Sequence, residues 1–119
     1  MHQQAAENNR AWIDEVFGNL DRKLSKVTLR SRDKIPYTTE DGIHKSYPGP
    51  GERGLAWWAN GFWSGLNWLM YEATANDEYR KTAEKAEETM DGAWLDFDQL
   101  HHDVGFMWHI MSGANYRLT

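Results

Sequence analysis

Two stretches of this sequence, residues 61–74 and 103–117, carry apolar side chains on nearly every side of a helix. A helix of that kind has to be buried on all sides. Each stretch follows another, over residues 7–26 and 77–94, in which the apolar residues recur at helical spacing on one face only. The chain is therefore expected to be all-α and to alternate between half-exposed and buried helices.

The half-exposed helices are predicted from their apolar faces. Over residues 7–26 this face consists of Trp12, Ile13, Val16, Phe17, Leu20 and Leu24. Over residues 77–94 it consists of Tyr79, Ala83, Ala86, Met90, Ala93 and Trp94. Asn76 or Asp77 is well placed as the N-cap of the second helix. The charged residues between the apolar ones predict a solvated face.

A long loop is expected over residues 31–56, between the first half-exposed helix and the first buried one. Its turn signals are Ile35-Pro36, Asp41-Gly42 and Tyr47–Gly51. A loop of this length inside a compact domain is usually functional or flexible.

Two helical hairpins with alternating exposure predict the outer and inner helices of an α/α toroid. The spacing of about 45 residues per helix pair lies in the range of helical repeats. Such units need stacked neighbours to bury their inner faces, so two pairs cannot close a ring. We therefore expect residues 1–119 to be the N-terminal part of a single larger domain. Alone, the chain would expose apolar inner faces, and we expect it to self-associate.

Charge and composition narrow the classes of protein to be considered. The net charge of −5 disfavours binding to nucleic acid, which requires a basic surface. The sequence has no run near the roughly 18 apolar residues that a membrane span needs. Residues 1–10 also lack the apolar core of a signal peptide. We therefore expect a cytoplasmic protein that binds neither nucleic acid nor membranes.

Two unusual motifs, Trp57–Trp63 and His101–Asp103, stand at the starts of the two buried helices. The inner helices of a toroid run parallel, so the two motifs should meet at one mouth. That mouth would combine aromatic walls, one carboxylate, two imidazoles and the positive ends of helix dipoles. Flat aromatic rings suit a sugar ring, and helix N-termini suit an anionic group on it. A uronic acid has both features.

The residues of these motifs also have purely structural interpretations. Asp103 could act only as a helix N-cap. His101 and His102 are adjacent, so they do not face the same way on a helix, and no third ligand is suitably spaced for a metal. We expect neither a metal nor a cofactor.

Other residues of the buried helices are expected to belong to the core. His109 is expected to be a core histidine with its hydrogen bonds satisfied. The same expectation of core packing applies to Trp63, Trp68 and Trp108. Gly61 and Gly65 predict close helix packing, because the sequence contains no phosphate-binding loop or nucleophile-elbow motif.

Two segments of the chain match one known family in both motif and spacing. Trp58–Gly65, followed by Trp68–Glu72, is similar to the pattern W-T-N-G-F-W-x-G…W-L-x-Y-E, with Ala59 in the place of Thr. Leu100–Met107 is similar to the pattern L-x-H-H-D-[IVL]-G-F. Over residues 55–119 the chain thus resembles the unsaturated glucuronyl hydrolases, glycoside hydrolase family 88.

This resemblance implies an (α/α)6 barrel of six hairpins, of which the chain would contain the first two. It implies release of a 4,5-unsaturated uronic acid from the non-reducing end of oligosaccharides made by lyases from glycosaminoglycans and similar polymers. In the implied reaction, water adds across the C4=C5 bond, and the resulting hemiketal collapses and frees the aglycone sugar.

The resemblance also implies roles for individual residues. Asp103 corresponds to one of two catalytic aspartates, His102 to a substrate-contacting histidine and Trp58 to the tryptophan that lines the sugar site. The second aspartate, to which the family assigns the main acid/base role, would lie beyond Thr119. A helix N-terminus favours the anion of Asp103, so a supporting carboxylate fits better than a proton donor. For the chain alone we therefore expect little or no catalysis.

Two other functions stay open at this point. One is an unsaturated rhamnogalacturonyl hydrolase, which shares the barrel and a similar His-Asp pair. The other is a non-enzymatic helical-repeat protein whose Trp-rich mouth binds a sugar or a partner helix. The doubled His101-His102 before Asp103 favours the glucuronyl hydrolase over the rhamnogalacturonyl hydrolase.

Overall fold

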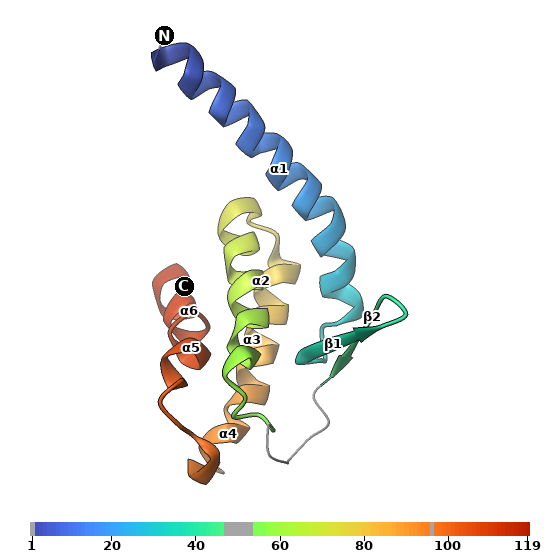
Figure 1. The fold of residues 1–119 in the computed structure, drawn as a ribbon, viewed down its shortest axis with the longest axis vertical. Helices are drawn as coiled ribbons and strands as arrows, with labels where there is room; N and C mark the ends of the chain where they lie inside the picture. Colours follow the sequence, from blue (N-terminus) through green and yellow to red (C-terminus); the bar gives the residue numbers. More distant parts are fainter. Residues whose placement is uncertain (1, 47–53, 96) are drawn as a thin grey trace.

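The computed structural model describes residues 2–46, 54–95 and 97–119, and these residues are mainly helical (Figure 1), in agreement with the all-α expectation. The helices and strands follow the order α1 (His2–Arg30), β1 (Pro36–Glu40), β2 (Ile43–Ser46), η1 (Trp58–Asn60), α2 (Gly61–Thr74), α3 (Asp77–Met90), α4 (Gly92–Leu95), η2 (Phe97–Gln99), α5 (Val104–Trp108) and α6 (Ser112–Leu118). α2 lies in the middle of the molecule and contacts α1, α3, α5 and α6. No helix in the described ranges is both long enough and apolar enough to cross a membrane.

α1 is longer at both ends than the predicted helix over residues 7–26. Four of the five added N-terminal residues are Gln or Ala, which favour helix. Near its C-terminal end α1 packs on the rest of the molecule, where Val27 and Thr28 are buried. The Thr28 hydroxyl donates a hydrogen bond to Oδ1 of Asn67 in α2 over 2.8 Å.

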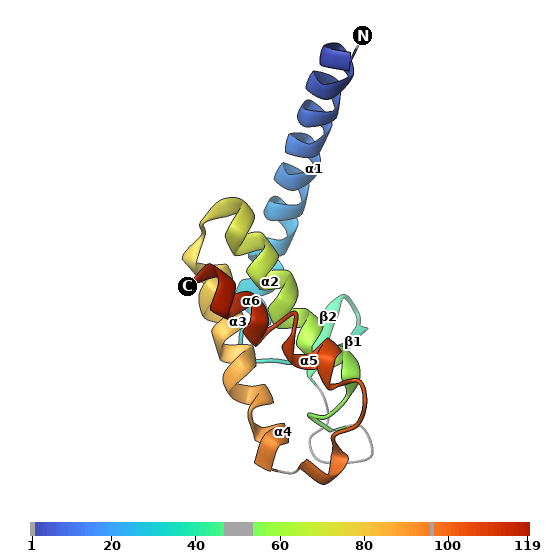
Figure 2. The same cartoon turned by 90° about the vertical axis from the view of Figure 1, so that its left-hand side faces the viewer.

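The N-terminal part of α1 projects beyond the other elements (Figures 1 and 2). Its apolar face is exposed, and the large side chains on it are Trp12, Ile13, Phe17 and Leu20. This face continues toward the buried Val27, so one stripe of the helix is covered at one end and open at the other.

The expectation of a loop throughout residues 31–56 is wrong, because β1 and β2 form an antiparallel hairpin there. Asp41 and Gly42 connect the strands with φ angles of 50° and 74°. Two consecutive residues with positive φ make the kind of tight turn that matches the twist of a hairpin, and Asp-Gly favours it. The predicted turn at Asp41-Gly42 is therefore present, but the short strands on either side of it were not expected.

α2 and α3 form an antiparallel helical hairpin with a tight connection. Ala75 ends α2 in the left-handed conformation, with φ 54°. Asn76 is the N-cap of α3, because its side-chain oxygen accepts a hydrogen bond from the backbone N–H of Glu78 over 3.0 Å. The N-cap predicted at Asn76 or Asp77 is thus confirmed at Asn76.

The core lies between α2, α3 and the segments that follow them, and Val27 of α1 and Ile35 also belong to it. Small residues of α3, Ala83 and Ala86, are fully buried and allow α2 to approach closely. The Ser64 hydroxyl of α2 donates to the backbone oxygen of Ala83 over 3.1 Å. Larger buried side chains fill the remaining space and include Trp63, Trp68, Met70, Tyr79, Met90, Met107 and Met111.

The helix predicted over residues 103–117 is divided into α5 and α6, with His109–Met111 between them. Met111 has φ −98° and ψ −91°, which is far from a helical conformation. Gly105 and Gly113 flank this break, and each glycine lowers helix propensity by about 1 kcal/mol relative to alanine. The predicted core position of His109 is also wrong, because the break leaves this side chain exposed.

The helix predicted over residues 77–94 ends earlier as well. α3 stops at Met90, and α4 covers Gly92–Leu95 as a separate short helix. Gly92 stands at this junction, where a glycine weakens the continuation of a helix.

α2 is not buried on every side, contrary to the expectation for residues 61–74. Phe62, Leu66 and Leu69 are exposed and lie on one face of the helix. Among the described residues no element covers this face. A helix that is apolar on nearly every side needs neighbours on several sides, and the described residues supply them on only part of α2.

Candidate functional site

The two motifs singled out in the sequence stand at the same end of neighbouring segments. A Cβ atom placed on Gly61 would lie 2.2 Å from the backbone oxygen of Met107, and one on Gly65 would lie 3.0 Å from that of Ile110. Gly61 thus faces Met107, and Gly65, later in α2, faces Ile110, later in the other segment. The two segments run parallel at this contact, and the close helix packing predicted for the two glycines is confirmed.

Trp58 lies in η1, immediately before α2, and forms the centre of an exposed aromatic cluster. Its ring centroid is 5.9 Å from that of Trp57, 5.8 Å from that of Phe62 and 6.0 Å from that of Phe106. The contacts with Phe62 and Phe106 are edge-to-face, a favoured arrangement of aromatic rings. Trp58 itself is 38% exposed. We call Trp57, Trp58, Phe62 and Phe106 the aromatic wall.

Phe106 belongs to the second motif region, three residues after Asp103, so it joins the two motifs. The structure therefore brings the Trp58 region against the segment that begins with His101–Asp103. The short helices η1 and α5 are in contact along this junction. This placement agrees with the expectation of one shared mouth.

Asp103 is flanked by the two histidines that precede it. Its Oδ2 lies 3.4 Å from Nδ1 of His101, and its Oδ1 lies 3.5 Å from Nε2 of His102. The Asp103 side chain is 25% exposed, whereas that of His102 is 89% exposed. A protonated imidazole at either position would form an ion pair with the carboxylate, so this group sits between two potential positive charges.

Asp103 occupies the N-cap position of α5, but its side chain makes no capping hydrogen bond. Its backbone oxygen accepts from the N–H of Phe106 over 2.9 Å, and its own N–H donates to Nδ1 of His101 over 3.3 Å. The purely structural interpretation, an N-cap, is therefore not what this carboxylate does. α5 has only five residues, so the dipole of a long helix, which was expected to stabilise the anion here, is also shortened.

Asn60, which sequence reasoning did not single out, supports the backbone around Trp58. It is buried, and its Nδ2 donates to the backbone oxygens of Gly54 and Leu55, each over 3.1 Å. Phe106 was also missed as a site residue, although both residues lie inside the motifs. Their closeness in the sequence could have indicated them, since Asn60 is two residues after Trp58 and Phe106 is three residues after Asp103.

The remaining tryptophans have structural surroundings. Trp63 and Trp68 are buried, and Nε1 of Trp68 donates to Oε1 of Glu87 in α3 over 2.7 Å. Trp108 is half-buried and packs against Trp94, with ring centroids 4.3 Å apart and the ring planes tilted by 36°. The core assignment is thus confirmed for Trp63 and Trp68 and holds in part for Trp108.

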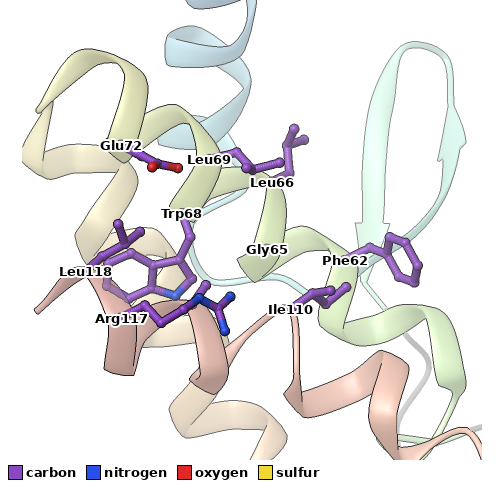
Figure 3. A pocket seen from close by; sticks show the side chains of 10 residues that line it. Phe62, Gly65, Leu66, Trp68, Leu69, Glu72, Ile110, Arg117 and Leu118 are labelled. Carbon is purple, nitrogen blue, oxygen red and sulfur yellow. The ribbon is translucent and has the colours of Figure 1, made fainter.

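An apolar groove of about 530 Å³ runs along α2 away from the aromatic wall (Figure 3). Phe62 lies at one end of it, and Glu72 and Arg117 lie near the other. Its walls are formed by Leu66 and Leu69 of α2 and, on the opposite side, by Ile110, Ala114 and Leu118. Within the described ranges, no three His, Asp or Glu side chains gather as a metal site would require.

The arrangement as a whole suits a sugar with an acidic group. An exposed indole offers a flat apolar face, and aromatic residues with a few polar groups are typical of ligand sites. The Asp103 carboxylate can accept hydrogen bonds from hydroxyl groups, and the neighbouring imidazoles can donate to an anionic oxygen.

Comparisons with known proteins support this picture. An unsaturated glucuronyl hydrolase of Bacillus sp. (strain GL1) is 37% identical over 105 residues, which cover 87% of this chain and 26% of that protein. An unsaturated chondroitin disaccharide hydrolase of Streptococcus pyogenes serotype M1 is 32% identical over 113 residues, which cover 88% of this chain and 26% of that protein.

A shorter match links the chain to an unsaturated chondroitin disaccharide hydrolase of Streptococcus pneumoniae (strain ATCC BAA-255 / R6), 34% identical over 63 residues. This match covers 52% of the chain and 16% of that relative. No protein-family model and no solved structure matches the chain. The chain spans about a quarter of the length of the first two relatives, and over most of its own length it is related to the unsaturated glucuronyl hydrolases.

Proposed function

We propose that this chain is the N-terminal part of a glycoside hydrolase that releases a 4,5-unsaturated uronic acid from the non-reducing end of lyase-generated oligosaccharides. The observation that carries the proposal is the Asp103 carboxylate between His101 and His102, on the segment that meets the aromatic wall. The printed names of the relatives, glucuronyl and chondroitin disaccharide hydrolases, support this class of substrate.

In this proposal the exposed face of Trp58 stacks on the unsaturated ring. Trp58 packs edge-to-face with Phe62 and Phe106 and is 38% exposed, so part of the indole is open to a ligand. His102, whose side chain is almost fully exposed, contacts the substrate from the other side of the mouth. The proposed binding residues are thus Trp58 and His102.

The proposed reaction is a hydration followed by ring opening. A proton adds to C4 and a hydroxyl from water adds to C5, which turns the enol ether into a hemiketal. The hemiketal opens to a ketone at C5, and the oxygen that leaves C5 stays on C1 as a hemiacetal hydroxyl. Loss of the aglycone alcohol then leaves an aldehyde at C1, and no oxidant or reductant is needed.

Asp103 has a supporting role in this scheme. Its carboxylate accepts hydrogen bonds from ring hydroxyls and organises charge as positive character develops at C5 during protonation of C4. Protonation of carbon needs a carboxylic acid held in its neutral form near the working pH. The proposal assigns that role to a second aspartate outside residues 1–119, so these residues alone should give little or no turnover.

A chimera tests the proposal directly. The matching segment of the Bacillus sp. relative would be replaced by this chain, and turnover of an unsaturated chondroitin disaccharide would be followed by loss of the ultraviolet absorbance of its C4=C5 bond. We expect an active chimera whose Asp103→Asn variant loses roughly 100-fold or more in kcat, the range for one catalytic group.

Asp98→Asn is the matched control, because Asp98 is an exposed acidic residue in η2 of the same segment. It should leave turnover unchanged. Near-normal activity in the Asp103→Asn chimera would contradict the proposed role of Asp103. A preference for unsaturated rhamnogalacturonides would instead support the related hydrolase, and binding without turnover would support a sugar-binding protein.

A further inference from the structure

The amide of Asn60 is a buried polar group whose donor capacity is used entirely on one short turn. Asn60 is 2% exposed and stands at the last position of η1. The two hydrogens of an amide nitrogen can serve two acceptors. Here Nδ2 donates to the backbone oxygens of Gly54 and Leu55, each over 3.1 Å.

These bonds close a loop of backbone around Trp57 and Trp58. The N–H of Trp57 also donates to the oxygen of Gly54 over 3.1 Å, so that oxygen accepts two hydrogen bonds. On the other side, the N–H of Asn60 donates to the oxygen of Trp57 over 3.0 Å. The Asn60 side chain thereby ties the residues before Trp57 to the residue two positions after Trp58.

Trp58 needs such support because its own ring is only partly enclosed. It is 38% exposed, and the ring contacts on it come from aromatic neighbours that are themselves exposed or half-buried. A side chain with a choice of positions loses conformational freedom when a ligand orders it, which weakens binding. A backbone fixed by buried hydrogen bonds removes part of that cost.

We propose that Asn60 is a positioning residue that holds Trp58 in the orientation for stacking on the sugar. The structural half of this inference stands on the hydrogen bonds around η1. The functional half rests on the proposed role of Trp58 in substrate binding.

Removing the amide should release the turn. The Gly54 oxygen would keep the hydrogen bond from the N–H of Trp57, but the Leu55 oxygen would lose the donor that Asn60 supplies. A buried carbonyl left without its donor costs about 1–3 kcal/mol, so the turn is expected to rearrange until water or another donor reaches Leu55. That rearrangement moves Trp58, whereas the helix contacts at Gly61 and Gly65 are made by other backbone atoms.

Asn67 provides a matched control inside the same structure. It is equally buried, and it lies in α2, where its Nδ2 donates to the backbone oxygen of Trp63 and its Oδ1 accepts from Thr28. Its loss should lower stability by weakening the contact between α1 and α2. It should leave the turn before Trp58 intact.

The first test uses the chain labelled with 5-fluorotryptophan. The sequence has seven tryptophans, and the spectrum of a Trp58→Phe variant identifies the ¹⁹F signal of Trp58. We expect Asn60→Ala to shift or broaden that signal while the signal of buried Trp68 stays in place. Asn67→Ser should destabilise the chain without moving the Trp58 signal.

An unchanged Trp58 signal in folded Asn60→Ala would overturn the inference. If Asn60→Ala does not fold, Asn60→Ser serves instead, because its hydroxyl can keep one of the two hydrogen bonds. In folded Asn60→Ser the Trp58 signal should move, but by less than it moves when the chain unfolds completely. An unchanged signal would again contradict the inference.

The second test measures the functional half in the chimera described above. Asn60→Ala should lower kcat/KM by roughly 10- to 100-fold, the range for a displaced positioning group, mainly through a higher KM. An active chimera with an unchanged KM in Asn60→Ala would overturn the positioning role. An inactive parent chimera would overturn the proposed function and leave the ¹⁹F result standing.

Discussion

Some side chains in this molecule interact with residues next to them in the sequence, and others interact with residues that are distant in the sequence. Asp103 belongs to the first group, because both imidazoles beside it come from the two preceding residues. Tyr79 belongs to the second group. It is buried in α3, and its hydroxyl donates to Oδ1 of Asp21 in α1 over 2.7 Å.

The Tyr79 hydroxyl is expected to stabilise the attachment of α1. Burial, together with the hydrogen bond to Asp21, raises the pKa of the Tyr79 phenol. Tyr79→Phe keeps the ring but removes this bond, and we expect the free energy of unfolding to fall by about 1–2 kcal/mol. Urea unfolding followed by circular dichroism measures the change. Tyr116→Phe, at an exposed position, is the control, and equal midpoints for the two variants would contradict the prediction.

His44 of β2 is expected to make stability depend on pH. Burial chiefly, followed by the charges of Arg30 and Lys34, lowers the pKa of His44 below its ordinary value of 6.5. The unfolded chain therefore binds a proton at a higher pH than the folded chain does. The contribution of His44 is fully present above pH 6.5 and is lost as the pH falls through the lower folded-state pKa.

The measurement compares unfolding midpoints of the parent and His44→Asn between pH 7.5 and pH 5, where neighbouring carboxylates contribute equally to both proteins. The parent should lose more stability on acidification than the variant. Parallel curves would show that the folded and unfolded chains bind the His44 proton equally.

Among single residues, the sequence predicted only those members of the candidate site that a family motif assigns. Trp58, His102 and Asp103 follow from the resemblance to a known family. Phe106 and Asn60 do not, because their importance comes from a contact between distant segments and from a buried turn. Periodicity and residue type do not indicate which aromatic rings from distant segments contact each other.

Helices with strong local signals were predicted well, and the elements without such signals were not. α2 covers the residues that the apolar pattern indicates, and Asn76 caps α3 as an Asx residue at that position favours. The β1–β2 hairpin was missed because two short, mostly exposed strands resemble a loop in the sequence. The break between α5 and α6 was missed because Met107 and Met111 keep helical spacing across it.

Gly61 holds the α2–α5 contact together, and its substitution should show this. In Gly61→Ala the new Cβ would lie 2.2 Å from the backbone oxygen of Met107, so α5 has to move. Overpacking of this kind costs about 1–3 kcal/mol or more. We expect a lower thermal midpoint and a changed near-ultraviolet signal from the aromatic wall.

Gly18→Ala is the matched control, because a Cβ at Gly18 in exposed α1 meets nothing within 4 Å. It should raise stability by about 0.5–1 kcal/mol, since alanine favours helix over glycine. If Gly61→Ala were as stable as Gly18→Ala, the close approach of α2 and α5 would not be present in solution.

The whole molecule leaves two apolar surfaces without a neighbour among its described residues. One is the projecting face of α1 around Trp12 and Phe17. The other is the face of α2 with Leu66 and Leu69, which borders the groove in Figure 3. The chain matches about a quarter of the length of its relatives, and exposed apolar surfaces of this kind favour association with other surfaces.

The chain on its own is therefore expected to self-associate. Sedimentation velocity should show species larger than a monomer whose proportion grows with concentration. A double variant, Leu66→Lys with Leu69→Lys, should shift the distribution toward monomer, whereas Leu29→Lys, at an exposed leucine outside the α2 face, should not. A monomer at every concentration, with a single cooperative melting transition, would refute this expectation.

The methionines in the core have a consequence for the chemical durability of the molecule. Met70, Met90, Met107 and Met111 are almost completely inaccessible to solvent. Peroxide converts an accessible thioether into a polar sulfoxide, which an apolar core cannot accommodate without loss of packing. While the helices stay together the four sulfur atoms are shielded. Once one opening event lets an oxidant in, each sulfoxide hinders reclosure, so oxidative damage to this chain should be self-reinforcing.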